Sequence, residues 1–393
     1  MIMALTIQHV LRPFFITCFI VGLGFYPIAD QKLRWIAYLN IPYSLTFWSV
    51  YGYFLYYAMI TFTYNILYST LTLVVMGINI LTTCTSVIMN LCYRKRFDIC
   101  LKKLAAVDDT LEELGTSKMY REINMWSKRM IICWIVCSLL INSYDMMWWV
   151  HLTDNTSWEF LVCNLLNHCH HLNTFMDLLF ISILWYIGSR FDKVNEHLQS
   201  LLKKEEHELR CRWKKPAIVH QYSLHINNYK RTLWILMHLY LELCRIARDL
   251  NVMFGIQLTL EMTSYVIYLT SQCHVLCIMW LNEHRLQISL YNWIGVACWV
   301  FVFIVRLYGI NYTCENVRIK ANMINKLIYK MTDTIEYANV WKETYHFILQ
   351  AMQNPLKFSG MGLFYFGNEY LRKLCTTVVT FIIILTQFNI YPT

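Results

Sequence analysis

Long apolar runs alternate with polar segments along the whole chain, and the apolar runs are long enough to be membrane helices. An α-helix rises about 1.5 Å per residue, so about 20 apolar residues cross the hydrocarbon core of a bilayer. The sequence predicts seven such helices, at residues 36–60, 66–92, 130–152, 160–188, 250–281, 290–312 and 367–388.

A shorter apolar run, residues 14–29, follows Arg12-Pro13 near the N-terminus. Gly22, Gly24 and Pro27 interrupt its helical pattern, and no signal-peptide cleavage site follows it. We expect a segment that dips into the membrane, and a true span is the alternative.

The polar segments also carry a helical pattern, because apolar residues recur in them at steps of three and four. Three such seams are present: Phe191, Val194, Leu198 and Leu201; Leu233, Leu236, Tyr240, Leu243, Ala247 and Leu250; Ile324, Leu327, Met331 and Ile335. They predict that spans four to seven continue as helices below the membrane. These helices are expected to pack into an intracellular bundle, either within one chain or between chains.

Composition supports a membrane protein. Hydrophobic residues make up 57% of the chain, charged residues 15%, and the mean hydropathy is +0.37. So few charges do not cover the surface of soluble domains. We therefore predict an all-α, polytopic membrane protein embedded in a lipid bilayer.

The basic residues are concentrated in three alternate loops. Nine Lys and Arg lie between spans two and three, twelve between four and five, and six between six and seven, out of 34 in the chain. The three opposite loops contain one, Arg285. Because cytoplasmic loops are rich in Lys and Arg, the N-terminus is predicted inside and the C-terminus outside. This is the reverse of a G-protein-coupled receptor. It also explains the net charge of +9 without a nucleic-acid partner.

The loop between spans three and four carries the sequon Asn155-Thr156-Ser157 and no Lys or Arg. Such a loop is expected outside the cell, with Asn155 as its glycosylation site.

Polar and aromatic residues cluster near the outer ends of several spans, as expected for a ligand cavity in a helical bundle. The candidate ligand-binding residues are Asp145, Trp148, Trp149, His151, Asn164, His168, His171, Gln257, Glu261, Tyr265 and Gln272. The tryptophans have an alternative as an interfacial aromatic belt. Carboxylates at membrane depth face a cavity, a wet path or a partner, which applies to Asp145 and Glu261. Asp177 and Arg306 lie nearer the inner side and are expected to reach the interface or to pair.

No catalytic or metal-binding motif stands out. His168, His170 and His171 lie near Cys163 and Cys169, but no further ligand sits at a firm spacing, and polar contacts are the favoured interpretation. The fifteen cysteines lie mostly in apolar runs, and we expect small buried hydrophobes and no disulfide framework. We expect neither an enzyme nor a cofactor. A transporter is the alternative of a different class, although no internal repeat is visible.

The last apolar run, Leu374 to Phe388, contains a polar stripe. Thr376, Thr380, Ile383 and Gln387 fall on one side of a helix. Polar side chains on an apolar helix need hydrogen bonds from a partner helix or from water. The stripe therefore indicates helix packing or a pore wall. Lys373 lies near the stripe, where its charge would oppose a cation path unless it turns toward an acidic neighbour such as Glu369.

This C-terminal run resembles the signature of insect gustatory receptors, TYhhhhhQF with h apolar. The matching residues run from Thr380 to Phe388, with Phe381 at the usual Tyr position. Residues 358–366 resemble the approach to the last helix in that family.

The resemblance implies a ligand-gated, cation-permeable channel in the plasma membrane of a sensory neuron. The resemblance also implies that four subunits assemble through a cytoplasmic anchor, around a pore lined by the last helix. Gln387 and Phe388 then match the narrow part of the pore, Thr380 and Phe381 match the start of the motif, and Thr376 and Ile383 lie on the same wall. The partners would be a small-molecule tastant, permeating cations, and either identical or related subunits.

The ligand class follows from one departure. Sugar-sensing members often carry Glu after the TY, where this chain has Ile382, so a non-sugar tastant is expected. The insect odorant receptor type is the nearest alternative.

The expected organisation has six parts. They are an N-terminal cytoplasmic or membrane-dipping segment (1–35), transmembrane helices one to four (36–188), anchor helices (189–249), transmembrane helices five and six (250–312), an anchor helix (313–357) and a pore-lining helix seven (358–393).

Overall fold

The computed structural model describes residues 7–24, 34–63, 70–153, 159–212, 219–281, 290–334 and 338–390. Nearly all of them are helical. The elements are α1 (Ile7–Val10), α2 (Arg12–Ile20), α3 (Arg34–Thr63), α4 (Thr70–Glu113), α5 (Tyr120–Thr153), α6 (Glu159–Arg212), α7 (Val219–Leu281), α9 (Leu290–Thr334), α10 (Ala338–Gln353), β1 (Ser359–Gly360), β2 (Phe364–Tyr365) and α11 (Asn368–Ile390).

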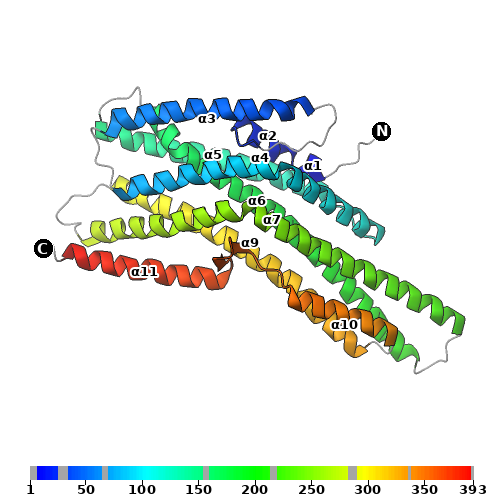
Figure 1. Cartoon of the computed structure of the whole chain (residues 1–393). Coiled ribbons are helices and arrows are strands. Elements are labelled where there is room, and N and C mark those ends of the chain that lie inside the picture. Colours follow the sequence, from blue (N-terminus) through cyan, green and yellow to red (C-terminus); the bar gives the residue numbers. More distant parts are fainter. Residues whose placement is uncertain are drawn as a thin grey trace.

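The helices form one elongated bundle, in which α6, α7 and α9 run on past the ends of α3 and α11 (Figure 1). These three helices have 54, 63 and 45 residues. Because about 20 residues cross a membrane, more than half of each lies outside the bilayer. The prediction that spans four, five and six continue as helices is therefore confirmed.

Within the described residues, five helices are long and apolar enough to cross a membrane, namely α4, α5, α6, α7 and α9. The helices α3 and α11 have 30 and 23 residues, which is also sufficient length for a crossing. The prediction of an all-α, polytopic membrane protein is confirmed.

The N-terminal apolar run does not contain a membrane-crossing helix in its described part. The helix α2 has only nine residues, about 13 Å of helix. Its Phe14, Phe15 and Cys18 are buried in the main core, and the rings of Phe14 and Phe175 lie 5.6 Å apart. The first part of the chain is thus a short helix packed into the core between longer helices. Residues 25–29 of this run lie outside the described residues.

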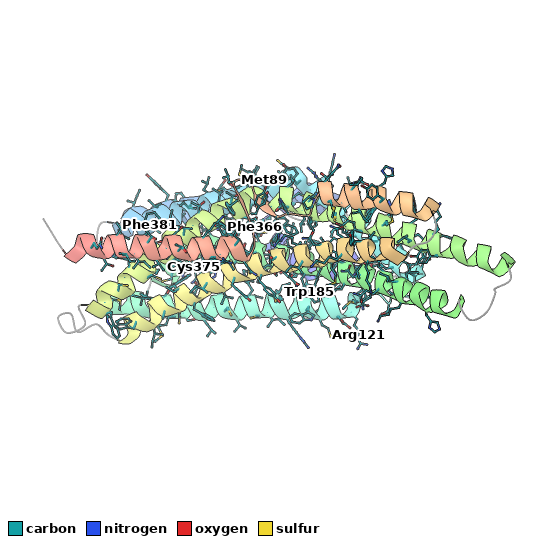
Figure 2. All side chains as sticks on the ribbon, turned by 90° about the horizontal axis from the view of Figure 1, so that it is seen from below. Met89, Arg121, Trp185, Phe366, Cys375 and Phe381 are labelled. Carbon is teal, nitrogen blue, oxygen red and sulfur yellow. The ribbon has the colours of Figure 1, made fainter. Side chains whose placement is uncertain are left out.

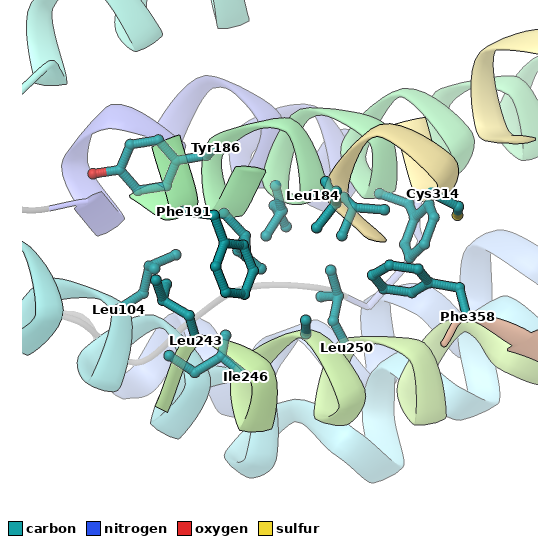
Figure 3. Packing of buried hydrophobic residues seen from close by; sticks show 14 of the residues in the cluster. Leu104, Leu184, Tyr186, Phe191, Leu243, Ile246, Leu250, Cys314 and Phe358 are labelled. Carbon is teal, nitrogen blue, oxygen red and sulfur yellow. The ribbon is translucent and has the colours of Figure 1, made fainter. Parts of the chain in front are cut away.

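The half of the bundle that extends beyond α3 and α11 is held by the predicted seams of α6 and α7, while Met331 and Ile335 of the third seam have side chains outside the described residues. Phe191 and Tyr240 lie 5.9 Å apart, and Tyr240 lies 5.5 Å from Phe347 of α10. Figure 3 shows Phe191 of α6 facing Leu243 and Leu250 of α7 across the core. The seam of α7 is buried along its whole length, and so is most of the seam of α6. The seam helices therefore pack into a bundle within one chain, and its position on the intracellular side stays a prediction.

The segment expected to be a single pore-lining helix begins with a turn instead. The strands β1 and β2 pair antiparallel, with Ser359 opposite Tyr365 and Gly360 opposite Phe364. Met361 and Gly362, at the turn, have φ values of 51° and 78°. This β-hairpin separates α10 from α11, so span seven is not continuous with its intracellular helix.

The cysteines are less uniformly buried than expected. Cys18, Cys100 and Cys314 lie in the core, but several others face outward: Cys84, Cys92, Cys133, Cys137, Cys298 and Cys375. An apolar outer surface is expected of helices in contact with lipid, and a weakly polar thiol fits there.

Candidate functional site

A connected set of polar side chains joins α5 to α6. Asn167 of α6 donates hydrogen bonds to Asp145 Oδ2 at 2.6 Å and to Asn142 Oδ1 at 3.1 Å, both on α5. Asn142 donates to Asn164 Oδ1 at 2.8 Å, and its Oδ1 lies 2.9 Å from His171 Nε2. We call these five residues the α5–α6 polar network. It brings together three of the predicted ligand-binding residues: Asp145, Asn164 and His171.

The helix α9 supplies an aromatic wall to this network. The indole N–H of Trp299 donates to Asp145 Oδ1 at 3.3 Å, so both oxygens of the half-buried carboxylate have partners. The rings of Tyr268 and Phe303 stack at 3.9 Å, and His170 lies 5.0 Å from Trp299. Aromatic walls with a few oriented polar groups are what small-molecule sites in helical bundles provide.

A buried cluster of charges lies next to this wall. Arg306 of α9 donates to Asp177 Oδ2 of α6 through Nε at 2.9 Å and Nη2 at 2.8 Å. Tyr265 of α7 donates to the same oxygen at 2.9 Å. Glu261 lies 3.9 Å from Arg306 and accepts from Gln257 at 3.1 Å. The expected pairing of Asp177 with Arg306 is confirmed, and the predicted Gln257, Glu261 and Tyr265 belong to this charge cluster.

The charge cluster has two carboxylates and one guanidinium. Asp177 and Glu261 are each 1% exposed and Arg306 is 6% exposed. Asp177 Oδ1 and Glu261 Oε2 have no hydrogen-bond partner among the described residues. A buried charge without a counter-charge costs several kcal/mol, and here a single guanidinium faces two carboxyl groups.

His168 does not join either group. Its ring lies against α3, 5.1 Å from Tyr51, 5.8 Å from Phe47 and 6.1 Å from Trp48. Its Nε2 is buried and has no hydrogen-bond partner in the part of the chain that the structure describes. His168 lies one helical turn before His171 on α6, but its ring packs against α3 and not within the α5–α6 polar network.

For the remaining predicted ligand-binding residues, the structure gives less detail. Gln272 is half-buried on α7. The side chains of Trp148, Trp149 and His151, and all of Asn155, lie outside the described residues. Within the described residues, no group of three or more His, Cys, Asp or Glu could hold a metal ion.

Two members of the site, Asn142 and Trp299, were missed by the sequence pattern, whereas Asn167 belongs to the polar group that begins span four. Asn142 lies three residues before Asp145, and this spacing places both on one helical face. That spacing could have identified it. Trp299 stands within a run of apolar residues, and nothing in the sequence marks it as a partner of Asp145.

The helix α11 packs by one side only. Leu374 and Val378 are buried, whereas the predicted stripe of Thr376, Thr380, Ile383 and Gln387 is exposed. Phe381 is also exposed, and Figure 2 shows it with Cys375 along α11 at the surface of the bundle. The side chain of Phe388 lies outside the described residues. Packing within one chain therefore does not explain the polar stripe.

Two details of the stripe reduce its polarity. Thr376 and Thr380 donate their hydroxyls to the carbonyls of Arg372 and Thr376, one turn earlier. Lys373 Nζ lies 2.8 Å from Glu369 Oε1, as expected from the sequence. The primary amide of Gln387 is then the strongest polar group of the stripe.

The sequence matches the family model described as 7tm Chemosensory receptor over residues 11–391. The chain belongs to this family. It is accordingly a multi-pass chemosensory receptor and not an enzyme, which confirms the resemblance at the level of the family.

Two solved structures share the fold. The insect olfactory receptor OR5 from Machilis hrabei in complex with eugenol has a TM-score of 0.58 and 12% identity, over 97% of this chain and 99% of that one. The insect olfactory receptor OR5 from the same organism has a TM-score of 0.53 and 11% identity, over 97% and 98%. A comparison with curated proteins gives no match.

Proposed function

We propose that this chemosensory receptor is a gustatory receptor that acts as a ligand-gated, non-selective cation channel in the plasma membrane of a sensory neuron. Four identical chains, or a mixture with related subunits, would surround a central pore lined by α11. Asn155 would carry a glycan on the outer side.

The observation that carries this proposal is the exposed stripe of α11. Leu374 and Val378 attach one side of the helix to the bundle, and Gln387 lies on the opposite side. A primary amide exposed to hydrocarbon costs free energy, so this side needs water or a second copy of the chain. Four copies arranged with this side inward would place polar side chains around a wet pathway.

The ligand would bind at the α5–α6 polar network and the aromatic wall of α9. Asp145 offers a hydrogen-bond acceptor, and Trp299 and Tyr268 offer ring faces. A tastant that binds more tightly when the helices are displaced shifts the population toward the open arrangement. At the pore, this displacement would replace an apolar constriction with the amide of Gln387.

A non-sugar tastant agrees with the environment of Ile382. This residue stands where sugar-sensing members often carry Glu, and its side chain packs against the main hydrophobic core. A carboxylate at this position would be partly buried without a partner.

Patch-clamp recording of the chain expressed alone tests the proposal. The cells are challenged with pooled sugars, pooled bitter compounds and cuticular lipids. We expect a cation current that persists when G-protein signalling is blocked. Saturable uptake without single-channel steps would instead support a transporter and would contradict the channel.

An odorant receptor type of channel is the second candidate, since the fold is shared with an olfactory receptor that binds eugenol. Adding eugenol and related volatile phenols to the panel separates the two. A response to volatile phenols at lower concentrations than to any tastant would favour the odorant type.

A further inference from the structure

The start of α11 rests directly on α9. The backbone N–H of Gly367 donates a hydrogen bond to Asn311 Oδ1 at 3.0 Å. The amide nitrogen of Asn311 donates to the carbonyl of Leu307 at 2.9 Å, and Asn311 is 0% exposed. Because both ends of its amide are occupied, the side chain is held in one orientation.

Gly367 approaches α9 more closely than another residue could. Its φ is 140°, a conformation that L side chains rarely adopt. A Cβ at this position would lie 2.5 Å from Glu315 Oε2, one turn beyond Asn311 on the same helix. We call Asn311, Glu315 and Gly367 the α9–α11 joint.

The β-hairpin before the joint is attached mainly to another helix. The backbone N–H of Ser359 donates to Asn251 Oδ1 of α7 at 3.2 Å. Phe358 is 2% exposed and lies near Cys314 and Leu250 in the core (Figure 3). Asn251 and Asn311 thus make comparable bonds to the two ends of the same segment, one from each helix.

The helix α9 also carries the wall of the candidate ligand pocket. Trp299 and Arg306 contact α5 and α6, and they lie about 100° or more around the helix from Asn311. The helix is continuous from Leu290 to Thr334. A displacement of one face therefore displaces the other, because a regular helix moves as one body on this length scale.

We propose that Asn311 is the positioning residue that couples the ligand pocket to the pore helix, through the α9–α11 joint. Movement of α9 on ligand binding is passed to the first turn of α11. This inference rests on the proposed channel function, in which α11 lines the pore.

The first test does not need a ligand or a current. Hydrogen exchange is measured on the purified full-length protein, wild type and Asn311→Leu, for peptides that contain Gly367. We expect the Gly367 amide to exchange at least about fivefold faster in the variant, because it loses a buried acceptor. Unchanged protection would show that Asn311 does not hold the joint and would overturn the inference.

The second test measures gating. The probe is the compound from the sugar, bitter and cuticular-lipid panel that evokes the largest wild-type current. For Asn311→Leu we expect the half-maximal concentration to rise about five- to tenfold, with single-channel conductance unchanged, since the coupling and not the pore is altered.

Asn251→Leu is the matched control, because it removes a similar bond to the same segment from α7. We expect it to leave the half-maximal concentration unchanged. An equal shift in both variants would reduce Asn311 to a general support of the hairpin and would overturn the inference.

If Asn311→Leu folds poorly, a milder variant is used. Asn311→Ser, whose hydroxyl is too short to reach Gly367, replaces it in both tests with the same expectations. Absence of wild-type current, with the chain expressed alone and with related subunits, would contradict the proposed channel function. A conducting wild type with an unshifted Asn311 variant would contradict this inference alone.

Discussion

Arg306 and Asp177 form a fully enclosed ion pair between α9 and α6, with Nη2 and Oδ2 2.8 Å apart and side-chain exposures of 6% and 2%. The guanidinium also lies over the ring of Tyr265, 5.1 Å from its centre. A buried pair of this kind contributes little compared with an apolar core, but removing one partner leaves an uncompensated charge. Replacing either Arg306 or Asp177 alone is therefore expected to destabilise the core of this receptor.

Arg306→Met is expected to destabilise the folded protein by about 3–5 kcal/mol, because it leaves Asp177 and Glu261 without a counter-charge. The measurement is the melting temperature of the detergent-solubilised protein, followed by size-exclusion chromatography. Arg245→Met is the control, since Arg245 pairs with Glu242 at an exposed site and its loss should cost about 0–1 kcal/mol. Equal losses for the two variants would contradict the prediction.

Glu261→Gln is expected to be tolerated, within about 1 kcal/mol of the wild type. The cluster has one guanidinium for two carboxylates, and a neutral amide has the shape of a protonated Glu261. Asp177→Asn should cost at least about 3 kcal/mol, because Arg306 then loses its bonded partner. A larger loss for Glu261→Gln than for Asp177→Asn would show that Glu261 carries the charge.

Asp145→Asn is expected to raise the half-maximal tastant concentration about tenfold, because the charged acceptor of Asn167 and Trp299 is lost. Ligand concentration-response curves in voltage-clamped cells provide the measurement. Glu196→Gln serves as a control, since Glu196 forms an exposed pair with Lys193 far along α6. An unchanged response in Asp145→Asn would remove Asp145 from the ligand site.

Gln387→Ala is expected to change single-channel conductance or relative ion permeability by about twofold or more, because it removes the strongest polar group of the stripe. Thr377→Ala is the matched control on α11. Its hydroxyl donates to its own helix at the carbonyl of Lys373, and Thr377 lies off the stripe. Conductance, selectivity and gating that stay unaltered in Gln387→Ala would contradict the pore assignment.

A buried ion pair between α4 and α6 predicts that removal of its two partners will have unequal effects on stability. Asp108 of α4 lies 3.2 Å from Arg190 of α6, with both side chains buried, and it accepts hydrogen bonds from Tyr120 and Tyr186 at 2.9 and 2.5 Å. Burial raises the pKa of the Asp108 carboxyl, against the opposing effect of Arg190. Without Arg190, Asp108 can take up a proton, whereas loss of Asp108 leaves a buried guanidinium without its counter-charge.

Asp108→Asn should therefore destabilise the protein more than Arg190→Gln, by about 1–3 kcal/mol. The stability of Arg190→Gln should also fall as pH rises, since a carboxyl with a raised folded-state pKa favours folding most when protonated. Melting temperatures from mildly acidic to mildly alkaline pH measure both effects. A larger loss in Arg190→Gln, or a stability that increases with pH, would contradict this account.

Much of the architecture could be predicted without coordinates. The apolar runs place the membrane helices because hydrocarbon admits only helices with satisfied backbones, and the seam around Tyr240 marks the buried side of α7. The pairing of Lys373 with Glu369 follows from their spacing of four on one helix. These are local properties, so neighbouring residues suffice to determine them.

The stripe of α11 shows a limit of prediction from the local sequence pattern. Thr376, Thr380, Ile383 and Gln387 share one side in any helix, and that pattern by itself favoured packing against another helix over a pore wall. The burial of Leu374 and Val378 on the other side decides that the stripe faces away from its own chain. Contacts between distant segments are required for that decision.

The sequence alone thus determined the seven apolar runs, the helical intracellular seams and the polar face of the last helix, because each depends on periodicity and solvent preference along a short stretch. Only the tertiary structure decided that Asp145 meets Trp299, that Glu261 joins Asp177 at one guanidinium, and that Gly367 rests on Asn311. These pairs are separated by many residues, and the angle and depth at which helices pack, which select such pairs, are not encoded in any single stretch.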